Sequence, residues 1–209
     1  MFAILGEDNS DVEMLSTLVK RISKTPNLPV KRKGYMGCAE LLNKGAKQII
    51  AYDKLGCTKF IICYDSDRSK PSDRYKIIVD RIIKSSGISA DFCALVPVQE
   101  IESWILADLP SITKIIPSWK TSKNFSNPES QDDPKEFLEK LARNEKYKPL
   151  YTHAIHNPRI AEHISLSEIA LKCPSSYPLF ELVQGSGGNY PTNSTASISE
   201  RRNAILAAL

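Results

Sequence analysis

Apolar residues in the first half of the chain follow two alternating spacings. Unbroken apolar runs, typical of buried strands, occur at residues 2–5, 59–64 and 92–98. Between these runs, apolar residues recur every three or four positions, which predicts amphipathic helices. The predicted helices cover residues 10–22, 38–53 and 73–85, and another begins at Ile101. This alternation over residues 1–108 predicts an α/β fold, with a parallel sheet covered by helices on both faces.

Local signals mark the ends of the first predicted helix. Ser10 or Asn9 can cap its N-terminus, and Glu13 lies three residues beyond Ser10, as in a capping box. Pro26 follows the last apolar position and ends the helix. We interpret the charged stretch at residues 31–33 as part of a solvated helix end and loop.

The second half of the chain has weaker patterns. Polar residues and proline are frequent at 117–135, which predicts a long loop or insertion. Short helices are predicted around residues 135–145, 158–171 and 175–184, then a Gly/Ser-rich loop at 185–199 and a last short helix capped by Ser199. We therefore expect a core at residues 1–110, a polar loop or insertion at 111–135, and a small, mostly helical C-terminal extension at 136–209 that packs on the core.

The composition is that of an ordinary globular protein and excludes several classes. Of the 209 residues, 42% are hydrophobic and 25% charged. No apolar run approaches the ~20 residues needed to cross a bilayer, and the start lacks the basic segment of a signal peptide. We expect a cytoplasmic protein without a membrane partner. The five cysteines form no C-x-x-C pair, so they indicate neither a zinc site nor a disulfide framework; Cys63 and Cys93 lie in apolar runs and are expected in the core.

The net charge of +4 permits a phosphate-bearing partner without requiring one. Basic residues are concentrated between Lys20 and Lys33 and at Arg68-Ser69-Lys70. Taken alone, the first group is explained by a solvated helix end and loop. Beside acidic residues, both groups would instead follow the phosphate backbone of a nucleic acid.

Acidic residues follow each of the three predicted strands. Glu7 follows the first strand, Asp65 and Asp67 follow the second, and Glu100 and Glu102 follow the third. The carboxyl ends of parallel strands align, and ligands of open α/β sheets bind outside these ends. We therefore expect these acids to converge at one edge of the sheet.

The spacing of the acids favours a metal site. Asp11 lies four residues after Glu7 across a strand-to-helix turn, so both can point over the same sheet edge. The side chains of Asp65 and Asp67 face the same way if the chain is extended. Carboxylates gathered in this way need a compensating charge, and Mg²⁺ or Mn²⁺, which prefer oxygen ligands, can supply it. Such a cluster can hold two ions, which stabilise the attacking and leaving oxygens of a phosphodiester.

The alternative interpretation is that these acids only cap the helices that follow them. This interpretation is sufficient for Asp11 or for Asp73 when each is considered alone. It explains Asp65 and Asp67 poorly, because they directly follow a six-residue apolar strand.

Three segments resemble one known family. Residues 5–11, Leu-Gly-Glu-Asp-Asn-Ser-Asp, and residues 64–67, Tyr-Asp-Ser-Asp, are similar to the motifs of the TOPRIM fold of topoisomerases, primases and OLD-type nucleases. The distance from Glu7 to Asp11 is similar to that of the OLD-like branch, which uses two metal ions. Residues 96–108 look like the E-x-W-L-x-A-D signature of small bacterial TOPRIM-like proteins, and residues 164–180 fit the C-terminal part of those proteins.

The resemblance covers most of the chain and is weakest at residues 110–155 and 185–209. It implies the TOPRIM version of a Rossmann-like sheet and a Mg²⁺-dependent nuclease acting on DNA or RNA. It implies catalytic roles for Glu7 as metal-linked general acid/base and for Asp65 and Asp67 as metal ligands, with Asp11 on a second ion and Glu102 or Glu100 as the later acidic ligand.

The same resemblance implies a transition-state lysine, for which no sequence pattern marks a position; Lys172 is one candidate. Members of this group often occur with an ABC-type ATPase in anti-phage systems, so the resemblance also implies an ATPase partner and an effector role. The sequence departs from the family at Asp8, where glycine usually follows the first glutamate, and this changes the turn that lets the backbone approach phosphate.

Two other functions stay open. One is a TOPRIM-derived adaptor that binds nucleic acid or a partner ATPase without cutting. The other is a Rossmann-like phosphatase with Asp65 as nucleophile, which leaves Glu7 and Asp11 without a role.

Other conspicuous residues favour structural roles. Trp104 lies at helical spacing with Ile101 and Ile105 and is expected in the core, although tryptophans such as Trp104 and Trp119 can stack on bases. No acid accompanies the histidines at metal-ligand spacing, so we interpret His153, His156 and His163 as structural; the alternative is that one of them contacts a phosphate or a metal. Residues 185–189 are rich in glycine but carry no Gly-Lys-Ser/Thr, so they are interpreted as a loop and not as a P-loop.

Overall fold

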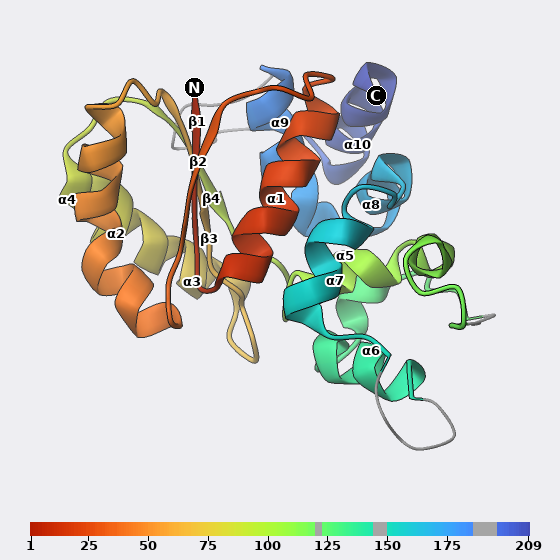
Figure 1. Ribbon diagram of the computed structural model, residues 1–209. Coiled ribbons are helices and arrows are strands. Elements are labelled where there is room, and N and C mark those ends of the chain that lie inside the picture. Colours follow the sequence, from red (N-terminus) through yellow and green to blue (C-terminus); the bar gives the residue numbers. More distant parts are fainter. Residues whose placement is uncertain (120–122, 144–149, 186–195) are drawn as a thin grey trace.

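A four-stranded parallel sheet lies at the centre of the molecule, with helices on both faces (Figure 1). The computed structural model describes residues 1–119, 123–143, 150–185 and 196–209. The strands are β1 (Phe2–Gly6), β2 (Val30–Gly34), β3 (Lys59–Cys63) and β4 (Asp91–Leu95), in the order β2-β1-β3-β4. The predicted Rossmann-like α/β architecture is confirmed.

The helices divide between the two faces of the sheet. One face is covered by α2 (Cys38–Asp53) and by a continuous helical stretch made of α3 (Pro71–Ile78), the π-helical turn η1 (Val79–Ile83) and α4 (Lys84–Ser86). The other side holds α1 (Asn9–Ile22), α5 (Glu102–Leu106), α6 (Pro134–Leu141), α7 (His153–Ile160), α8 (Leu166–Lys172), α9 (Tyr177–Gln184) and α10 (Ile198–Ala208). Three 3₁₀ turns, η2 (Leu109–Lys114), η3 (Pro128–Ser130) and η4 (Pro174–Ser176), lie between them.

The central strands are apolar throughout because both of their faces are buried. In β3, Ile61 and Cys63 pack into the hydrophobic cluster on the α1 side, whereas Phe60 and Ile62 pack into the cluster beneath α2 and α3. Successive side chains of a strand point to opposite faces, so an unbroken apolar run serves both clusters. Cys63 and Cys93 are buried core residues, as predicted.

The prediction of a helix end and loop at residues 31–33 is wrong, because these residues form β2. Within the described residues this strand pairs only with β1, in parallel register from Phe2↔Val30 to Gly6↔Gly34. The side chains of Lys31, Arg32 and Lys33 are exposed, so no apolar pattern marks the strand. Backbone pairing does not require apolar side chains at an edge, and lysines there discourage pairing with another chain.

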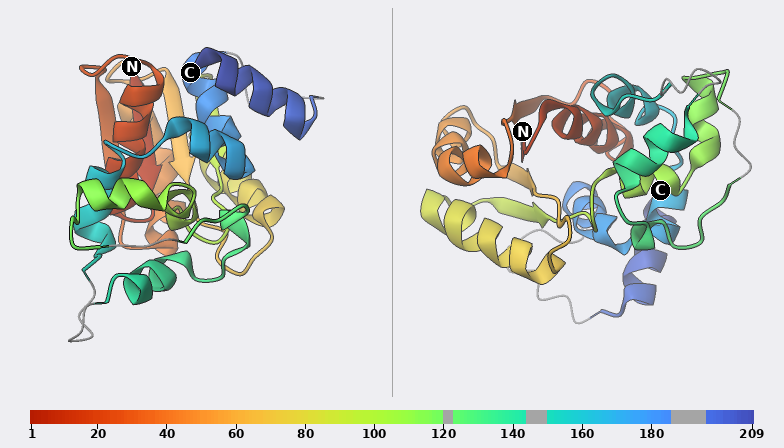
Figure 2. Two further views of the ribbon diagram at one scale, coloured as in Figure 1. Left: turned by 90° about the vertical axis from the view of Figure 1, so that its right-hand side faces the viewer. Right: turned by 90° about the horizontal axis from the view of Figure 1, so that it is seen from below.

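The chain order of the strands creates a switch point between β1 and β3. From β1 the chain passes to β2 on one side and then to β3 on the other, so the connections leave in opposite directions. Ligands of open α/β sheets bind outside the carboxyl ends of the strands at such a point. Figure 2 (right) looks onto this end of the molecule, where α1 and α3 begin.

Several predicted helix ends are corrected. Asp8, not Ser10 or Asn9, caps α1. The predicted helix at 158–171 is two helices, α7 and α8, separated by a turn, and the last helix is capped by Ser197 in a capping box with Glu200 instead of by Ser199. The loop predicted at 185–199, including the P-loop-like segment 185–189, lies largely outside the described residues.

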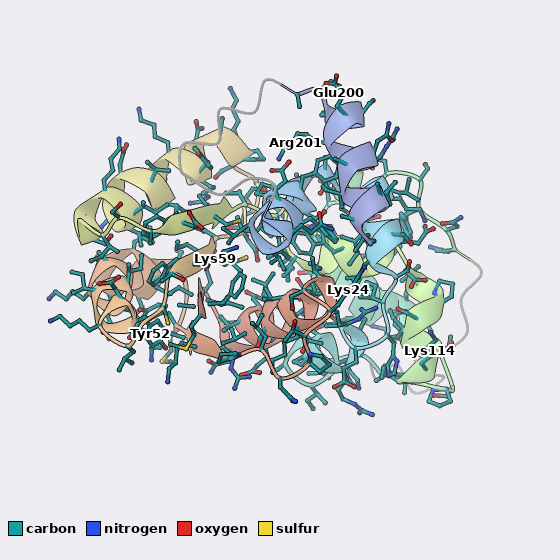
Figure 3. All side chains as sticks on the ribbon, turned by 90° about the horizontal axis from the view of Figure 1, so that it is seen from above. Lys24, Tyr52, Lys59, Lys114, Glu200 and Arg201 are labelled. Carbon is teal, nitrogen blue, oxygen red and sulfur yellow. The ribbon has the colours of Figure 1, made fainter. Side chains whose placement is uncertain are left out.

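The helical C-terminal part shares one hydrophobic cluster with β1 and α1, so it packs on the sheet. Trp104 is fully buried, as predicted, and its Nε1 donates to Ser175 Oγ at 2.9 Å. Figure 3 views the opposite end of the sheet, where Lys24 Nζ donates to Ala208 O at 3.2 Å and Lys59 Nζ to Leu182 O at 3.0 Å. None of the described helices combines the length and the apolar character that spanning a bilayer requires.

Candidate functional site

Asp8 holds the turn between β1 and α1. Its Oδ1 accepts hydrogen bonds from the backbone N–H groups of Ser10 at 2.6 Å and Asp11 at 3.0 Å. Gly34 of β2 packs against this turn, where a Cβ atom would lie 2.4 Å from Asn9 Oδ1 and 2.6 Å from the Asp8 carbonyl carbon. The Asp8 carboxylate thus occupies the N-terminal amides of α1, which would otherwise be open to an anion. The turn places acidic side chains and does not form a phosphate cradle.

Glu7 and Asp65, from the ends of the adjacent strands β1 and β3, are joined by a hydrogen bond. The Asp65 backbone N–H donates to Glu7 Oε1 at 3.0 Å. Burial raises the pKa of Glu7 from 4.5 to about 7, although this hydrogen bond acts in the opposite direction. A carboxyl group with a pKa near neutrality can take up and release a proton, as a general acid/base must.

Two further acids of the site, Asp11 and Glu102, are almost completely buried, with 5% and 2% of their surface exposed. Burial raises the pKa of Asp11, and the charges of Asp8 and Glu102 raise it further. Burial also raises the pKa of Asp65, followed by the charges of Asp11 and Glu102. Burial is the main cause of the raised pKa of Glu102 as well. The charges of Glu7 and Glu102 oppose the ionisation of both Asp11 and Asp65, so these four carboxyl groups lie near one another at the switch point.

Asp67 lies at the rim of this group. The expectation that Asp65 and Asp67 face the same way from an extended chain is wrong, because Asp67 has φ +48°. Its side chain is 56% exposed and lies 3.4 Å from Arg74 Nη2. Its backbone N–H donates to Gln99 O at 2.9 Å, and Gln99 also has a positive φ, +60°. Backbone held in this sparsely populated region is found at functional sites more often than elsewhere.

Glu100 and Glu102 take different places. Glu102 belongs to the buried group, whereas Glu100 is partly exposed and its Oε2 accepts the backbone N–H of Lys135 at 3.0 Å. Burial and the charge of Glu102 raise the pKa of Glu100. Of the two candidates for the later acidic ligand, Glu102 acts more strongly on the other acids: its charge raises the pKa of both Asp11 and Asp65, whereas the charge of Glu100 is a smaller cause for Asp65.

A polar cavity of about 290 Å³ opens beside the acids. Two arginines, Arg68 and Arg74, line it together with Asp67, Ser69, Gln99, Glu100 and Asp133. Arg74 stacks on the ring of Tyr64 at 4.5 Å and donates to its hydroxyl group, which fixes the guanidinium on the cavity wall. The cavity therefore joins carboxylates and guanidinium groups on one concave surface.

The C-terminal helices contribute His153 and two residues that the sequence gave no reason to select, Lys135 and Asn157. Lys135 lies in the first turn of α6. Its pKa is raised despite burial, because Glu102 and Glu100 lie near its ammonium group. Within the described part of the chain it has no ion-pair partner. Asn157 of α7 donates to Glu102 Oε1 at 3.0 Å. His153 Nδ1 is buried without a partner among the described residues; burial, and then the charge of Lys135, lower the His153 pKa.

Lys172, the lysine suggested from the sequence, lies elsewhere. Its Nζ donates to Ala107 O at 2.8 Å and lies 2.7 Å from Glu168 Oε2. His156 accepts the backbone N–H of Thr152 at 2.9 Å and so serves the start of α7. Trp119 is 3% exposed and packs near Tyr151, so it is not available for base stacking.

The donor set matches a hard divalent cation in kind, because every buried acid presents oxygen. Asp65 Oδ1 is buried and has no hydrogen-bond partner among the residues described, as expected of an atom that awaits a ligand. As the described side chains stand, no three Asp, Glu, His or Cys groups are close enough to hold one ion. Ion binding therefore requires rotation of at least one carboxylate toward the others.

Comparison with known proteins gives one match. A family model described as a domain of unknown function, DUF4276, matches residues 6–183. No curated protein and no solved structure matches the chain. The matched residues run from the end of β1 into α9, so they include the acids, Lys135 and Asn157.

Proposed function

The chain belongs to the DUF4276 family, and we propose that it is a Mg²⁺-dependent nuclease of the TOPRIM type that cleaves phosphodiester bonds of DNA or RNA. The observation that carries this proposal is the convergence of Glu7, Asp11, Asp65 and Glu102 at the switch point of the sheet. Structural carboxylates seldom gather where their charges repel one another, whereas a metal site requires such an arrangement.

The metal site is proposed to use the buried acids. Asp65, Asp11 and Glu102 would hold Mg²⁺ or Mn²⁺, with Asp67 and Glu100 as ligands at the rim if a second ion binds. A bound ion would supply Lewis-acid stabilisation of the charge that develops on the phosphodiester oxygens. Glu7, whose pKa is about 7, would accept the proton of the attacking water.

Lys135 is the cation placed to act on the substrate. Its ammonium group is charged and near the acids, and among the described residues it has no ion-pair partner, so it is free to contact a phosphate oxygen. A fixed positive charge at a phosphoryl group stabilises the transition state more than the ground state. Lys135 therefore takes the role for which Lys172 was the earlier candidate.

Positive charge on both sides of the acids supports nucleic acid as the substrate. Arg68 and Arg74 line the adjoining cavity, and the exposed residues Lys31, Arg32 and Lys33 lie along the edge strand next to β1. Basic side chains in such positions attract the phosphate backbone without reading its sequence. The resemblance to small OLD-like TOPRIM proteins adds an ABC-type ATPase as partner and a cytoplasmic role as effector of an anti-phage system.

A second function is favoured by two observations. The Asp8 carboxylate fills the N-terminus of α1, and no three described carboxylates share one ion position as they stand. Both agree with a TOPRIM adaptor that binds nucleic acid or the ATPase without cutting. A phosphatase with Asp65 as nucleophile is less favoured, because Asp65 Oδ1 is buried.

A cleavage assay separates these functions. Purified protein, with and without the ATPase, is incubated with supercoiled plasmid and with tRNA in Mg²⁺ or Mn²⁺. We expect cleavage by the native protein and none by Glu7→Gln or Asp65→Asn, with Asp80→Asn, an exposed acid on η1, as the matched control. Intact substrates under every metal and partner condition would remove the nuclease and leave the adaptor.

The role of Lys135 is tested in the same assay. Lys135→Met is expected to lower kcat by about 10²–10³-fold, the usual cost of removing one transition-state contact. Lys140→Met is the matched control, because Lys140 lies on the same helix but pairs with Glu136 in solvent. An equal loss in both variants would show that α6 matters only for folding.

A further inference from the structure

Asn157 lies directly against Glu102 inside the protein. Its Nδ2 donates to Glu102 Oε1 at 3.0 Å. Tyr151 in turn donates its hydroxyl group to Asn157 Oδ1. Both Asn157 and Tyr151 are 0% exposed, so no water competes for these hydrogen bonds. The three side chains form a buried chain of hydrogen bonds that ends on the carboxylate of Glu102.

The tyrosine fixes which way the amide of Asn157 points. An amide has a donor end and an acceptor end, and the Tyr151 hydroxyl hydrogen requires an acceptor. In the described structure that acceptor is Asn157 Oδ1, so the amide nitrogen must face Glu102. Reversing the amide would leave the buried hydroxyl hydrogen unpaired, at a cost of about 1–3 kcal/mol.

Tyr151 is itself held by aromatic packing. Its ring stacks with that of His156 at a centroid distance of 6.0 Å and lies 6.5 Å from the ring of Trp119. Tyr151 lies two residues before the start of α7, which packs on α1, the helix that carries Asp11. The hydrogen-bond chain therefore connects the docking of α7 with the orientation of Glu102.

We propose that Asn157, held by Tyr151, is a positioning residue that aims the Glu102 carboxylate at the metal ion. The hydrogen bond from Asn157 holds the Glu102 carboxylate in one orientation, from which it would contact the ion. Groups that hydrogen-bond a metal ligand from outside usually account for 10–100-fold in metal affinity. This inference rests on the proposed function, because it assigns Glu102 to the ion.

The test is the affinity for Mn²⁺, measured by isothermal titration calorimetry without nucleic acid. Asn157→Leu, which keeps the volume but removes the donor, is expected to weaken binding by about 10–100-fold. Tyr151→Phe, which frees the amide to turn, is expected to weaken it in the same direction by a smaller factor. Ser175→Ala is the matched control, because it removes the hydrogen bonds to Trp104, two residues after Glu102, and to Glu129 without touching the acids of the site.

The dependence of the cleavage rate on Mn²⁺ concentration provides a second measurement. In Asn157→Leu the Mn²⁺ concentration for half-maximal rate should rise by the same factor, while kcat at saturating Mn²⁺ should recover, since the reacting groups are intact. If Asn157→Leu does not fold, Tyr151→Phe decides the matter, because it removes a single oxygen atom.

The outcomes distinguish this inference from the proposed function. Native protein that binds Mn²⁺ and cleaves, with unchanged Mn²⁺ affinity in Tyr151→Phe and in any folded Asn157→Leu, overturns the positioning role alone. An equal loss in Ser175→Ala overturns it too, because that would reflect general loosening of α5. Native protein that neither binds Mn²⁺ nor cleaves overturns the proposed function and the positioning role together.

Discussion

The raised pKa of Glu7 predicts that the metal-free protein loses stability as the pH rises. Glu7 titrates at about 7 in the folded protein, against an ordinary value of 4.5. Between these two values the folded state binds more protons than the unfolded state. The stabilising contribution is therefore complete below pH 4.5 and is lost as the pH rises through 7. Asp11, Asp65 and Glu102 act in the same direction, because their pKa values are also raised by burial.

The size of the Glu7 contribution follows from the two pKa values. A difference from 4.5 to 7 corresponds to at most about 3.4 kcal/mol at about 1.36 kcal/mol per pH unit. Glu7 is only partly buried, and solvent screening reduces this to about 2 kcal/mol. In Glu7→Gln the amide oxygen can still accept the Asp65 N–H, so the variant removes the titration and keeps the hydrogen bond.

Urea unfolding in EDTA at pH 5 and pH 8 measures this contribution. At pH 5 Glu7 is protonated, and the native protein and Glu7→Gln should have similar free energies of unfolding. At pH 8 Glu7→Gln should be the more stable by about 2 kcal/mol. Adding Mg²⁺ at pH 8 should raise the free energy of unfolding of the native protein more than that of the variant. Parallel pH profiles for the two proteins in EDTA would refute this account of the site.

Two further predictions concern the turn between β1 and α1. Gly34→Ala should lower the free energy of unfolding, measured in urea, by about 1–3 kcal/mol, because the new Cβ would meet the backbone of Asp8 and Asn9. Gly45→Ala is the control, because its Cβ would meet the side chain of Ile82. Equal losses in the two variants would contradict the close approach of Gly34 to the turn. Asp8→Ala should lower the free energy of unfolding by about 1 kcal/mol, because it removes the helix cap, whereas Asp8→Asn, which keeps the accepting oxygen, should lower it little. Equal thermal unfolding temperatures for the two variants would show that the Asp8 side chain does not stabilise α1 as a cap.

The predictable parts of the fold were those whose burial leaves a pattern in the sequence. Strands β1, β3 and β4 are buried on both faces, so each is an apolar run. Among the described strands, β2 pairs with β1 alone, and its lysines and arginine are exposed and carry no signal of burial. Hydrophobic pattern therefore reports what a residue packs against and not what its backbone pairs with.

The same limit applies to the candidate site. Glu7 and Asp65 could be brought together from sequence because aligned strand ends impose their proximity. The position of Asp67 could not, since it depends on a left-handed backbone that an aspartate seldom adopts. Lys135 and Asn157 reach the acids only through the docking of α6 and α7, and no local spacing relates them to Glu102.

The division of the site between sheet and C-terminal helices also sets the order in which it is assembled during synthesis. The last of the described strands ends at Leu95, whereas Lys135 and Asn157 belong to helices that leave the ribosome later. An emerging chain thus presents its carboxylates before their counter-charge and amide donor have been made. A chain cut short before α7 would carry the acids without a finished site, so the proposed cleavage of nucleic acid would begin only after α7 has been made.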